Sequence, residues 1–362
     1  MPIKSVHIQN FKSIREAEVE LSQINVLIGP NGGGKSNFIS FFKFLNKLYE
    51  QQLQLYISQN GRADNFLYFG RKRSAFLKGK IVFNNDWQNQ YEFKMAPEQG
   101  GSLIFVNESS THSKDPSSRI YYGEDLNSSG SLETRLRLDS QLSNHSLRLE
   151  LQSFKIYHFH DTSFNSKVKQ HSSTSDYARL YEDGGNLAAF LYRLQESEPK
   201  TLGLIEKIIT SIAPFFHRFY LQPDEINPQQ IFLRWQEKGS DQLFTAHNLS
   251  DGTLRMICLA TLLLQSNLPD TIIIDEPELG LHPFAIAKLA GMIKSASHHS
   301  QIIISTQSIS LLNHFSPDDV IVVERENEQS VFKRLNEEEL SSWLEEYTLG
   351  ELWDKNVIGG RP

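Results

Sequence analysis

The sequence contains one cysteine, Cys258, among 362 residues. A single cysteine excludes an intrachain disulfide framework and a zinc site built from several thiolates. The sequence has no run of about 18 apolar residues, so we expect no transmembrane helix. Residues 1–4 lack the apolar stretch and the small-residue cleavage site that begin and end a signal peptide. Together these absences favour a cytoplasmic protein.

An excess of positive charge is missing as well. Lysine and arginine number 36 against 43 aspartate and glutamate residues, a net charge of −7, which argues against a polycation that coats nucleic acid. A local patch matters more than the total, and the densest one combines residues 71–73 with Lys78 and Lys80. This basic cluster could contact DNA or could be a solvated loop, which is the commoner case. The interleaved aromatic residues, which could stack on bases, are Phe66, Tyr68, Phe69 and Phe76.

The apolar residues that are present predict an α/β protein. A short apolar run at 24–28 predicts a strand, and a long amphipathic helix should follow it. Later runs at 271–274, 302–304 and 320–323 are continuous rather than alternating, which is typical of strands buried on both faces of a parallel sheet. No repeat of 20–50 residues and no sustained heptad pattern occurs, so we expect no long coiled-coil arm. The apolar positions with helical spacing after the first run are Phe38, Phe41, Phe42, Leu45 and Leu48.

The middle of the chain has a different pattern. Between 61 and 160 apolar and polar residues alternate, which predicts half-buried β-strands. Helical spacing returns after Gly184 and Gly185, and Pro214 should end the second helix of that region. The alternating positions are Tyr91, Phe93, Met95, Leu147, Leu149 and Leu151. The polar stretches that predict mobile surface loops are 107–118, 127–131 and 162–176.

Residues 29–36, Gly-Pro-Asn-Gly-Gly-Gly-Lys-Ser, match the phosphate-binding pattern G-x-x-x-x-G-K-[ST]. The segment follows a predicted strand and opens a predicted helix, which is the context that the pattern requires. Its glycines let successive backbone N–H groups converge on phosphate oxygens, and the helix N-terminus adds positive potential. Lys35 should reach the β- and γ-phosphates, and the Ser36 hydroxyl should hold Mg²⁺. The alternative is a glycine-rich turn without a ligand.

Two adjacent carboxylates, Asp275 and Glu276, follow the apolar run at 271–274. Ligands of open α/β sheets bind at the carboxyl ends of the strands, so both side chains should lie at the binding edge. Asp275 suits a Walker B residue that completes the Mg²⁺ shell, and Glu276 is placed to polarise an attacking water. A simple turn at the end of the strand is the alternative, since Asp-Glu-Pro is reasonable turn chemistry. The phosphate loop makes the catalytic interpretation the stronger one.

A third segment, residues 249–253 (Leu-Ser-Asp-Gly-Thr), precedes another predicted helix. Ser250 is a good N-cap, and small neighbours leave backbone N–H groups exposed at the start of a helix, where anions bind. An isolated string of this kind is more often an ordinary capped helix. Its position just before the acidic strand makes the anion-binding interpretation specific.

These segments together resemble the ABC-type ATPase heads of the SMC/RecF/OLD group. The closest resemblance is to stand-alone bacterial AAA-family (AAA_21-like) ATPases that lack a fused TOPRIM nuclease. It extends over the whole chain as a single ATPase head with an α/β fold, a mixed and parallel sheet, an inserted antiparallel β region and a helical signature subdomain. The segments that carry the resemblance are 8–14, 29–36, 249–253, 278–283, 347–353 and 356–360.

The resemblance implies a division of the head into four parts. Residues 1–60 would hold the N-terminal strands, the phosphate loop and the first helix. Residues 61–180 would form the inserted β region, and 181–265 the helical subdomain with the signature motif. Residues 266–362 would hold the Walker B strand, the switch strand and the C-terminal segment.

The resemblance also implies a set of ligand-binding residues for ATP and Mg²⁺. The ATP-binding residues would be Lys12, Asn31, Gly32, Gly33, Gly34, Lys35, Ser36 and Asn37. The metal ligands would be Ser36 and Asp275, the catalytic residues Glu276 and Gln307, and the signature residues Ser250, Asp251 and Gly252. In such heads each ATP lies between the phosphate loop of one protomer and the signature motif of another. We therefore expect a homodimer or higher homo-oligomer that ATP holds together.

The sequence departs from the family at the switch residue, where a histidine usually follows a late strand. Here Gln307 stands in that place, and an amide can hydrogen-bond a γ-phosphate or a water but cannot carry a proton. Slow turnover is therefore expected. The sequence does not indicate where the Q-loop of the family lies. Residues 157–162 are a candidate neighbour of the nucleotide or an ordinary β edge with two histidines. A zinc site there is unfavourable, because no third ligand with suitable spacing is evident.

Three functions remain open at this point. The first is an ATPase whose dimerisation controls DNA or a separate effector protein, a nuclease or toxin, plausibly in anti-phage defence. The second is a RecF-like DNA-repair clamp that binds DNA directly, which the acidic net charge disfavours. The third is an ATP-bound scaffold that hydrolyses very slowly. A transporter subunit is a distant fourth, since the β insertion does not suit it.

Overall fold

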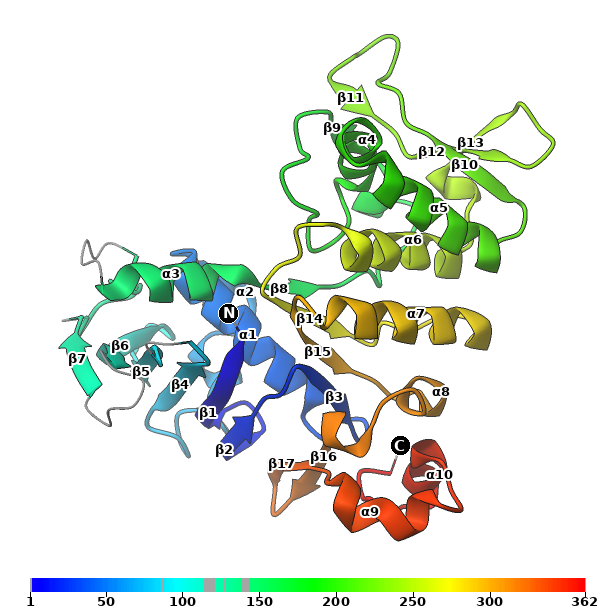
Figure 1. Cartoon of the computed structure of the whole chain (residues 1–362). Helices are drawn as coiled ribbons and strands as arrows, with labels where there is room; N and C mark the ends of the chain where they lie inside the picture. Colours follow the sequence, from blue (N-terminus) through cyan, green and yellow to red (C-terminus); the bar gives the residue numbers. More distant parts are fainter. Residues whose placement is uncertain (1, 86–87, 114–120, 127, 138–142, 362) are drawn as a thin grey trace.

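The computed structural model describes residues 2–85, 88–113, 121–126, 128–137 and 143–361 (Figure 1). An antiparallel sheet occupies the N-terminal side of the molecule, with the strand order β2-β1-β4-β5-β6-β7. Alternation along these strands turns Tyr91, Phe93 and Met95 inward, as the sequence predicts. The bounds of the strands are β1 Ile3–Phe11, β2 Ile14–Glu20, β4 Leu77–Phe83, β5 Gln90–Pro97, β6 Leu103–Ser113 and β7 Tyr121–Asp125.

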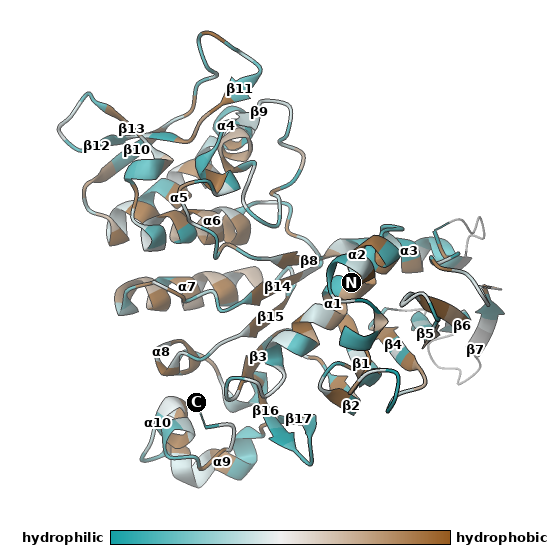
Figure 2. Cartoon of the chain, turned by 180° about the vertical axis from the view of Figure 1, so that it is seen from behind, coloured by the Kyte–Doolittle hydropathy of each residue, from teal (hydrophilic) through white to brown (hydrophobic). Residues whose placement is uncertain are grey.

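The second sheet has the order β17-β16-β3-β15-β14-β8. Five of its strands are parallel, and β17 returns antiparallel along β16. The central residues of strands β14 and β15 are strongly hydrophobic, as Figure 2 shows. The bounds are β3 Ile24–Ile28, β8 Phe154–Tyr157, β14 Thr271–Asp275, β15 Gln301–Ser305, β16 Val320–Glu326 and β17 Gln329–Arg334.

The parallel sheet separates two hydrophobic cores because side chains alternate along its strands. Ile272 and Ile274 point into one core, whereas Ile273 points into the other. Helix α1 (Lys35–Tyr49) lies between this sheet and the antiparallel sheet, and α7 (Pro283–Ala296) covers the opposite face (Figure 1). Burial on both faces explains why these strands are continuous apolar runs in the sequence.

A lobe of helices and short strands rises beside α7 (Figure 1). Its three long helices are α4 Leu187–Ser197, α5 Pro199–Ile212 and α6 Asp251–Leu264. Its short strands are β9 Ser172–Ser173, β10 Phe216–Tyr220, β11 Gln230–Ile231, β12 Arg234–Glu237 and β13 Leu243–Thr245. Within the described part of the chain, no helix combines the length and apolarity needed to cross a membrane.

Further helices complete the described part of the molecule. The remaining α-helices are α2 Leu53–Gln59, α3 Ser143–Ser153, α8 Ile309–Leu312, α9 Glu337–Leu344 and α10 Leu349–Asp354. The 3₁₀ helices are η1 Ala63–Asn65, η2 Lys167–Lys169, η3 Ala246–Asn248 and η4 Pro317–Asp319. The two C-terminal helices α9 and α10 lie beside β16 and α8 (Figure 1).

Two predictions of local structure are wrong. The alternation at Leu147, Leu149 and Leu151 predicts a strand, but these residues belong to α3. Leu147 and Leu151 are four residues apart, so both lie on the buried face of a helix, while Leu149 is 54% exposed. The loop predicted from 107 is also wrong as far as residue 113, because β6 continues to that residue. Residues 114–118 of that prediction lie outside the described residues.

The polar composition of 107–113 misled the prediction because the most polar of its buried side chains, Glu108, is hydrogen-bonded inside the protein. The carboxylate of Glu108 is fully buried and accepts hydrogen bonds from the hydroxyls of Tyr91, Ser128 and Thr134 and from the Arg135 N–H. A buried carboxylate is tolerated when every lone pair has a donor. The donors come from distant positions, so the sequence pattern alone could not reveal them.

Candidate nucleotide-binding site

The phosphate loop connects β3 to α1 at the carboxyl edge of the parallel sheet. Lys35 is the first residue of α1, and its side chain is buried. Its Nζ donates to the carbonyl oxygens of Gly29 at 2.6 Å and Pro30 at 3.2 Å, which curls the loop around the ammonium. Asn31, Gly32 and Ser36 are exposed on the outside of the curl. The loop thus leaves Asn31, Gly32 and Ser36 open to solvent around one buried cation.

A chain of hydroxyl groups supports the loop from behind. Ser330 Oγ donates to the Gly33 carbonyl at 2.6 Å and lies 2.7 Å from Ser13 Oγ. Asn37 Nδ2 donates to Ser13 Oγ at 2.7 Å. Gly34 has a φ of 125°, and a Cβ there would overlap the Ser330 hydroxyl, so glycine is required. Sequence reasoning missed Ser13 and Ser330, since they are 317 positions apart.

A pocket of about 450 Å³ opens beside the first turn of α1. Lys12 enters it from the hairpin between β1 and β2, with its Nζ 5.8 Å from the centroid of the Phe66 ring. Burial, followed by the neighbouring positive charge of Lys43, lowers the pKa of Lys12. The lining residues are Lys12, Ser13, Asn37, Asn60, Asn65, Phe66, Leu67, Phe69 and Arg325. The pocket combines aromatic faces with amide and cationic groups.

The two predicted carboxylates lie at the end of β14, as expected. Asp275 Oδ1 accepts a hydrogen bond from the Ser305 hydroxyl on the adjacent strand β15. Glu276 has a φ of 42°, a left-handed conformation that is uncommon for a residue with a side chain, and its N–H donates to the Ser305 carbonyl at 3.0 Å. This bend turns the chain sharply at the edge of the sheet.

The phosphate loop and the carboxylates form one electrostatic unit. Burial lowers the pKa of the Lys35 ammonium. The negative charges of Glu276, Asp275 and Glu278, in that order of strength, oppose this decrease in pKa. Three carboxylates therefore act on one buried cation.

Gln307 completes the unit from the segment that follows β15. Its Nε2 donates to Glu276 Oε1 at 2.5 Å. Its backbone N–H donates to Glu278 Oε1 at 3.2 Å, and the same oxygen accepts from the Thr306 hydroxyl at 2.5 Å. Glu278 is thus the side chain that connects the loop after β14 to the switch segment. The sequence indicated Glu278 only as the first residue of 278–283, a segment that carries the family resemblance, and did not predict this contact.

The environment of Glu278 is unusual for a carboxylate. Burial raises its pKa, and the negative charge of Glu276 adds to the increase. Within the described part of the chain, its Oε2 is buried and has no hydrogen-bond partner. A carboxylate with one unpaired buried oxygen favours the protonated form, because desolvation penalises the charged form.

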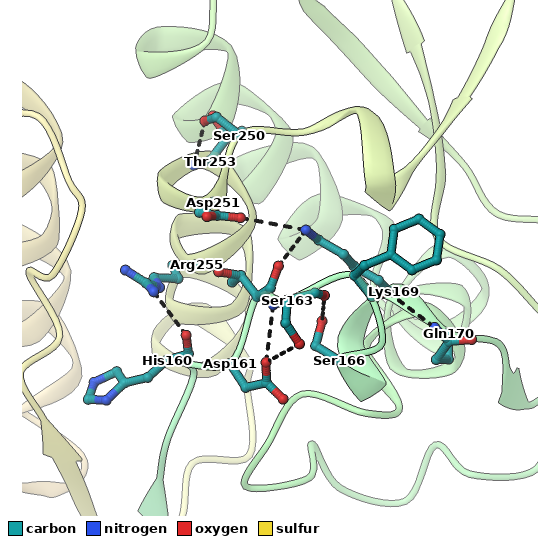
Figure 3. Close-up of polar contacts among 12 residues, drawn as sticks. His160, Asp161, Ser163, Ser166, Lys169, Gln170, Ser250, Asp251, Thr253 and Arg255 are labelled. Atoms are coloured by element: carbon teal, nitrogen blue, oxygen red, sulfur yellow. Dashed lines mark hydrogen bonds and ion pairs between the residues drawn. The ribbon is translucent and has the colours of Figure 1, made fainter.

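The signature segment forms the start of α6 (Figure 3). Ser250 is the N-cap, and its Oγ accepts from the Thr253 N–H at 3.2 Å. A Cβ on Gly252 would lie 2.5 Å from the carbonyl oxygen of Gly280, so the helix start packs directly against the loop after β14. Arg255 reinforces this contact by donating to the Leu279 carbonyl at 2.7 Å and to the His160 carbonyl at 2.9 Å.

Residues 157–162 run beside these elements. The Nε2 of His160 lies 2.7 Å from the backbone carbonyl oxygen of Asp275, so this segment contacts the end of β14. Burial, followed by the positive charge of Lys43, lowers the pKa of His158. The segment therefore joins the acidic edge to the signature helix through His160.

The basic cluster is largely engaged in contacts within the chain. Arg71 pairs with Asp64 at 3.0 Å, and Arg73 pairs with Glu328 at 2.9 Å. Lys78 pairs with Glu92 at 2.9 Å. The guanidinium of Arg73 also lies 4.6 Å from the centroid of the Phe69 ring. These partners favour the solvated-loop interpretation of the cluster over a dedicated DNA site.

A model of the family described as "AAA domain, putative AbiEii toxin, Type IV TA system" matches residues 24–313, most of the chain. The chain belongs to this AAA-domain family. The match begins at β3, and includes the phosphate loop, the signature segment, the two carboxylates and Gln307. No match was found among curated proteins.

Solved structures place this AAA-domain chain among SMC-head folds. A crystal structure of an SmcHead bound to the C-winged helix domain of ScpA is 16% identical, with a TM-score of 0.64 over 94% of this chain and 100% of that chain. An Smc head with an extended coiled coil from Pyrococcus furiosus, bound to the C-terminal domain of ScpA, is 15% identical, with a TM-score of 0.58 over 95% and 98%. The SMC head domain from Thermotoga maritima gives 14% identity and a TM-score of 0.50 over 93% and 100%. These likenesses concern the fold, and they confirm the predicted ABC/SMC-head-like α/β class.

Proposed function

We propose that the chain is an ATPase that binds ATP and Mg²⁺ at the phosphate loop and hydrolyses ATP in a head-to-tail dimer. The observation that carries the proposal is the grouping of a buried Lys35 with Asp275, Glu276 and Gln307 at one edge of the sheet. Each residue type suits one task of phosphoryl transfer, and the family match supports the assignment.

Each residue of the site has its own role in binding or hydrolysing ATP. Lys35 and the backbone N–H groups of residues 31–34 bind the β- and γ-phosphates. Ser36 and Asp275 hold Mg²⁺, which neutralises the charge that develops on the phosphate oxygens when it is bound. Glu276 orients and deprotonates the attacking water, and Gln307 fixes the carboxylate of Glu276.

The pocket beside α1 is the place for the nucleoside. It adjoins Asn37, the residue after Ser36, and its aromatic faces and amides suit a base and a ribose. Lys12 contributes a cation next to the phosphates. Phe69, which is 49% exposed, offers a ring on which a base stacks.

The signature residues act on the ATP of a second copy of the chain. Ser250 and Gly252 begin a 14-residue helix, α6, whose N-terminal N–H groups favour an anion. The direct packing of Gly252 on Gly280 lets the signature helix and the loop after β14 move as one surface. ATP would join two such surfaces, and hydrolysis would release them.

The dimer would control a separate effector protein in the cytoplasm. The matching family is described as a putative toxin of a toxin–antitoxin system, and two similar SMC heads are bound to parts of ScpA. Both descriptions suit a head that acts with a protein partner. A nuclease or toxin that ATP-driven dimerisation switches on, in anti-phage defence, fits this role. Direct DNA binding as in a RecF-like clamp is less favoured, because the basic cluster is paired with acids.

A second candidate function, an ATP-bound scaffold, is favoured by one observation. Glu276 accepts a hydrogen bond from an amide that cannot relay a proton. Because Gln307 can neither take up nor release a proton during the reaction, turnover would be slow. The ATP-bound dimer would then persist.

The test is steady-state ATP turnover of the full chain with and without duplex DNA, with Glu276→Gln as the blank. Turnover above the blank supports the ATPase, and a several-fold increase with DNA supports a DNA-sensing clamp. Turnover that ignores DNA supports a protein partner as the regulator. Turnover equal to the blank, together with an ATP-dependent dimer in light scattering, favours the scaffold. Absence of both turnover and dimer would refute the proposal.

A further inference from the structure

We infer that Lys169 is a positioning residue of the shared ATP site, where it neutralises Asp251 so that the signature segment accepts the partner's nucleotide. This inference rests on the proposed function. It concerns a lysine that belongs to none of the motifs above. It also assigns a use to residues 162–170, part of the stretch 162–176 that the sequence predicted to be a mobile surface loop.

Asp251 creates an electrostatic problem. Its side chain is 62% exposed at the start of α6, between the two residues proposed to meet the partner's γ-phosphate. A carboxylate at this position repels the anionic nucleotide, and repulsion between like charges extends over several ångströms even near a protein surface. A compensating cation is therefore needed close by.

Lys169 supplies that cation (Figure 3). Its Nζ lies 3.5 Å from Asp251 Oδ1, and its side chain is only 9% exposed. Its close hydrogen bond, at 2.5 Å, goes to the neutral backbone carbonyl of Thr162. The carbonyl fixes the ammonium without cancelling its charge, so the charge remains to offset Asp251.

The segment that carries Lys169 is fixed at several points along the signature helix. The Phe164 ring lies 4.7 Å from the ring of His247, just before the signature segment. The His160 carbonyl accepts from Arg255, one turn into α6, and Val168 is buried. A cation that is held in place loses little side-chain entropy on pairing, unlike a lysine on a flexible surface.

A second acid lies near Lys169. The exposed Asp161 has a lowered pKa, mainly through hydrogen bonds from Ser163 and in small part through the Lys169 charge. Asp161 is held by the Ser163 hydroxyl at 2.7 Å, whereas Asp251 lies within ion-pair distance of Lys169. The test must therefore separate the effect on Asp251 from a general loss of charge in the segment.

The experiment is a double-mutant cycle on the full chain that carries Glu276→Gln, so that ATP is bound but not consumed. The variants are Lys169→Met, Asp251→Asn and the combination of the two. Dimerisation with ATP and Mg²⁺ is followed by light scattering over a range of protein concentrations. Binding of a fluorescent ATP analogue to the dilute monomer is measured in parallel. Lys167→Met is the matched control, because Lys167 is 77% exposed and pairs with Asp183.

We expect Lys169→Met to weaken ATP-dependent dimerisation by about tenfold or more and to leave ATP binding by the monomer unchanged. Asp251→Asn should restore dimerisation in the double variant. Asp251→Asn alone should dimerise at least as tightly as the Glu276→Gln parent. This measurement does not depend on whether Lys169→Met folds. Lys169→Arg should retain dimerisation, and Lys167→Met should behave as the parent.

The outcomes distinguish the inference from the proposed function. If the Glu276→Gln parent fails to dimerise with ATP, the proposed function is wrong and the inference is overturned with it. If the parent dimerises and Lys169→Met dimerises equally well, only the inference is overturned. A defect in Lys169→Met that Asp251→Asn does not relieve also overturns it, because Lys169 would then act through something other than Asp251.

Discussion

Glu276, Gln307 and Glu278 form a small hydrogen-bonded group in which each side chain limits what the others can do. Gln307 donates its amide to Glu276, and Glu278 accepts from the backbone of Gln307. The amide orients the carboxylate but has no proton to exchange. The chemistry of the site therefore depends on two carboxylates. Glu276 is the one proposed to contact the attacking water, and Glu278 is the one that accepts from the backbone of Gln307.

The first prediction concerns Gln307→His. A histidine in this place can hydrogen-bond Glu276 and can also carry a proton, so steady-state ATP turnover should rise by at least about threefold. The same substitution in a Glu276→Gln chain should give no increase, because the base is then missing. An equal rate in Gln307→His and the parent chain would show that the switch residue does not limit turnover.

The second prediction concerns the stability of Glu278→Gln. Burial raises the pKa of Glu278 in the folded protein, so the folded state binds this proton more tightly than the unfolded state. Its contribution to stability is therefore present below the unfolded pKa and is lost as the pH rises through the folded pKa. Relative to the parent, Glu278→Gln should gain stability as the pH is raised from 5 to 8.

Thermal unfolding at several pH values measures this effect. We expect the melting temperature of Glu278→Gln to exceed that of the parent by about 1–3 °C at pH 8 and by less at pH 5. Glu328→Gln is a suitable control, since Glu328 lies on the surface, 58% exposed. A difference that does not depend on pH would mean that the carboxyl group stays ionised throughout this range.

At the scale of elements, the sequence analysis succeeded where neighbouring residues determine the outcome. The phosphate loop, the strand before it and the helix after it follow from glycine, apolar and helical patterns within 25 residues of each other. The strand prediction for residues 143–153 was wrong because leucines spaced every two residues are also spaced every four, so the same pattern fits a strand or a helix. The structure shows a helix, α3, in this place. Contacts such as Ser13 with Ser330 join separate elements, and no local pattern indicates them.

The third prediction concerns the contact between α6 and the loop after β14. A Cβ in Gly252→Ala would lie 2.5 Å from the Gly280 carbonyl oxygen, so one of the two backbones must move. We expect a loss of about 1–3 kcal/mol in stability and at least a tenfold loss of ATP-dependent dimerisation. Thermal unfolding and light scattering measure the two effects.

The matched control for Gly252→Ala is Gly291→Ala. Gly291 lies within α7, and among the described residues no atom outside its own stretch of helix lies within 4 Å of the position of its Cβ. Alanine there should stabilise the chain by about 0.5–1 kcal/mol through helix propensity and leave dimerisation unchanged. Dimerisation of Gly252→Ala equal to that of Gly291→Ala would contradict a shared surface of α6 and the loop.

At the scale of the whole molecule, the class of fold was predictable because buried parallel strands leave continuous apolar runs. The candidate site was predictable in part. The residues that would bind and cleave ATP within one chain were found by their motifs, and the structure groups Lys35, Asp275, Glu276 and Gln307. Lys169 and Glu278 were not assigned a role, because their meaning depends on which elements pack together. The pairing of two chains stays a prediction, because it depends on contacts between chains that a single chain does not show.

The last prediction tests that pairing directly. Lys35→Met disables the phosphate loop of a chain but leaves its signature segment intact. Ser250→Arg disables the signature segment but leaves the phosphate loop intact. Each variant alone should be inactive, because every site in its dimer is broken.

An equal mixture forms mixed dimers in which the intact loop of one chain meets the intact signature of the other. If sites act independently, random pairing should restore about a quarter of the parent turnover, since half of the dimers carry one working site of two. Mixed dimers that form, as detected by two affinity tags, but do not hydrolyse ATP would mean that both sites must be intact together. Activity of Ser250→Arg alone would place the whole reaction within one chain and would remove the need for a partner.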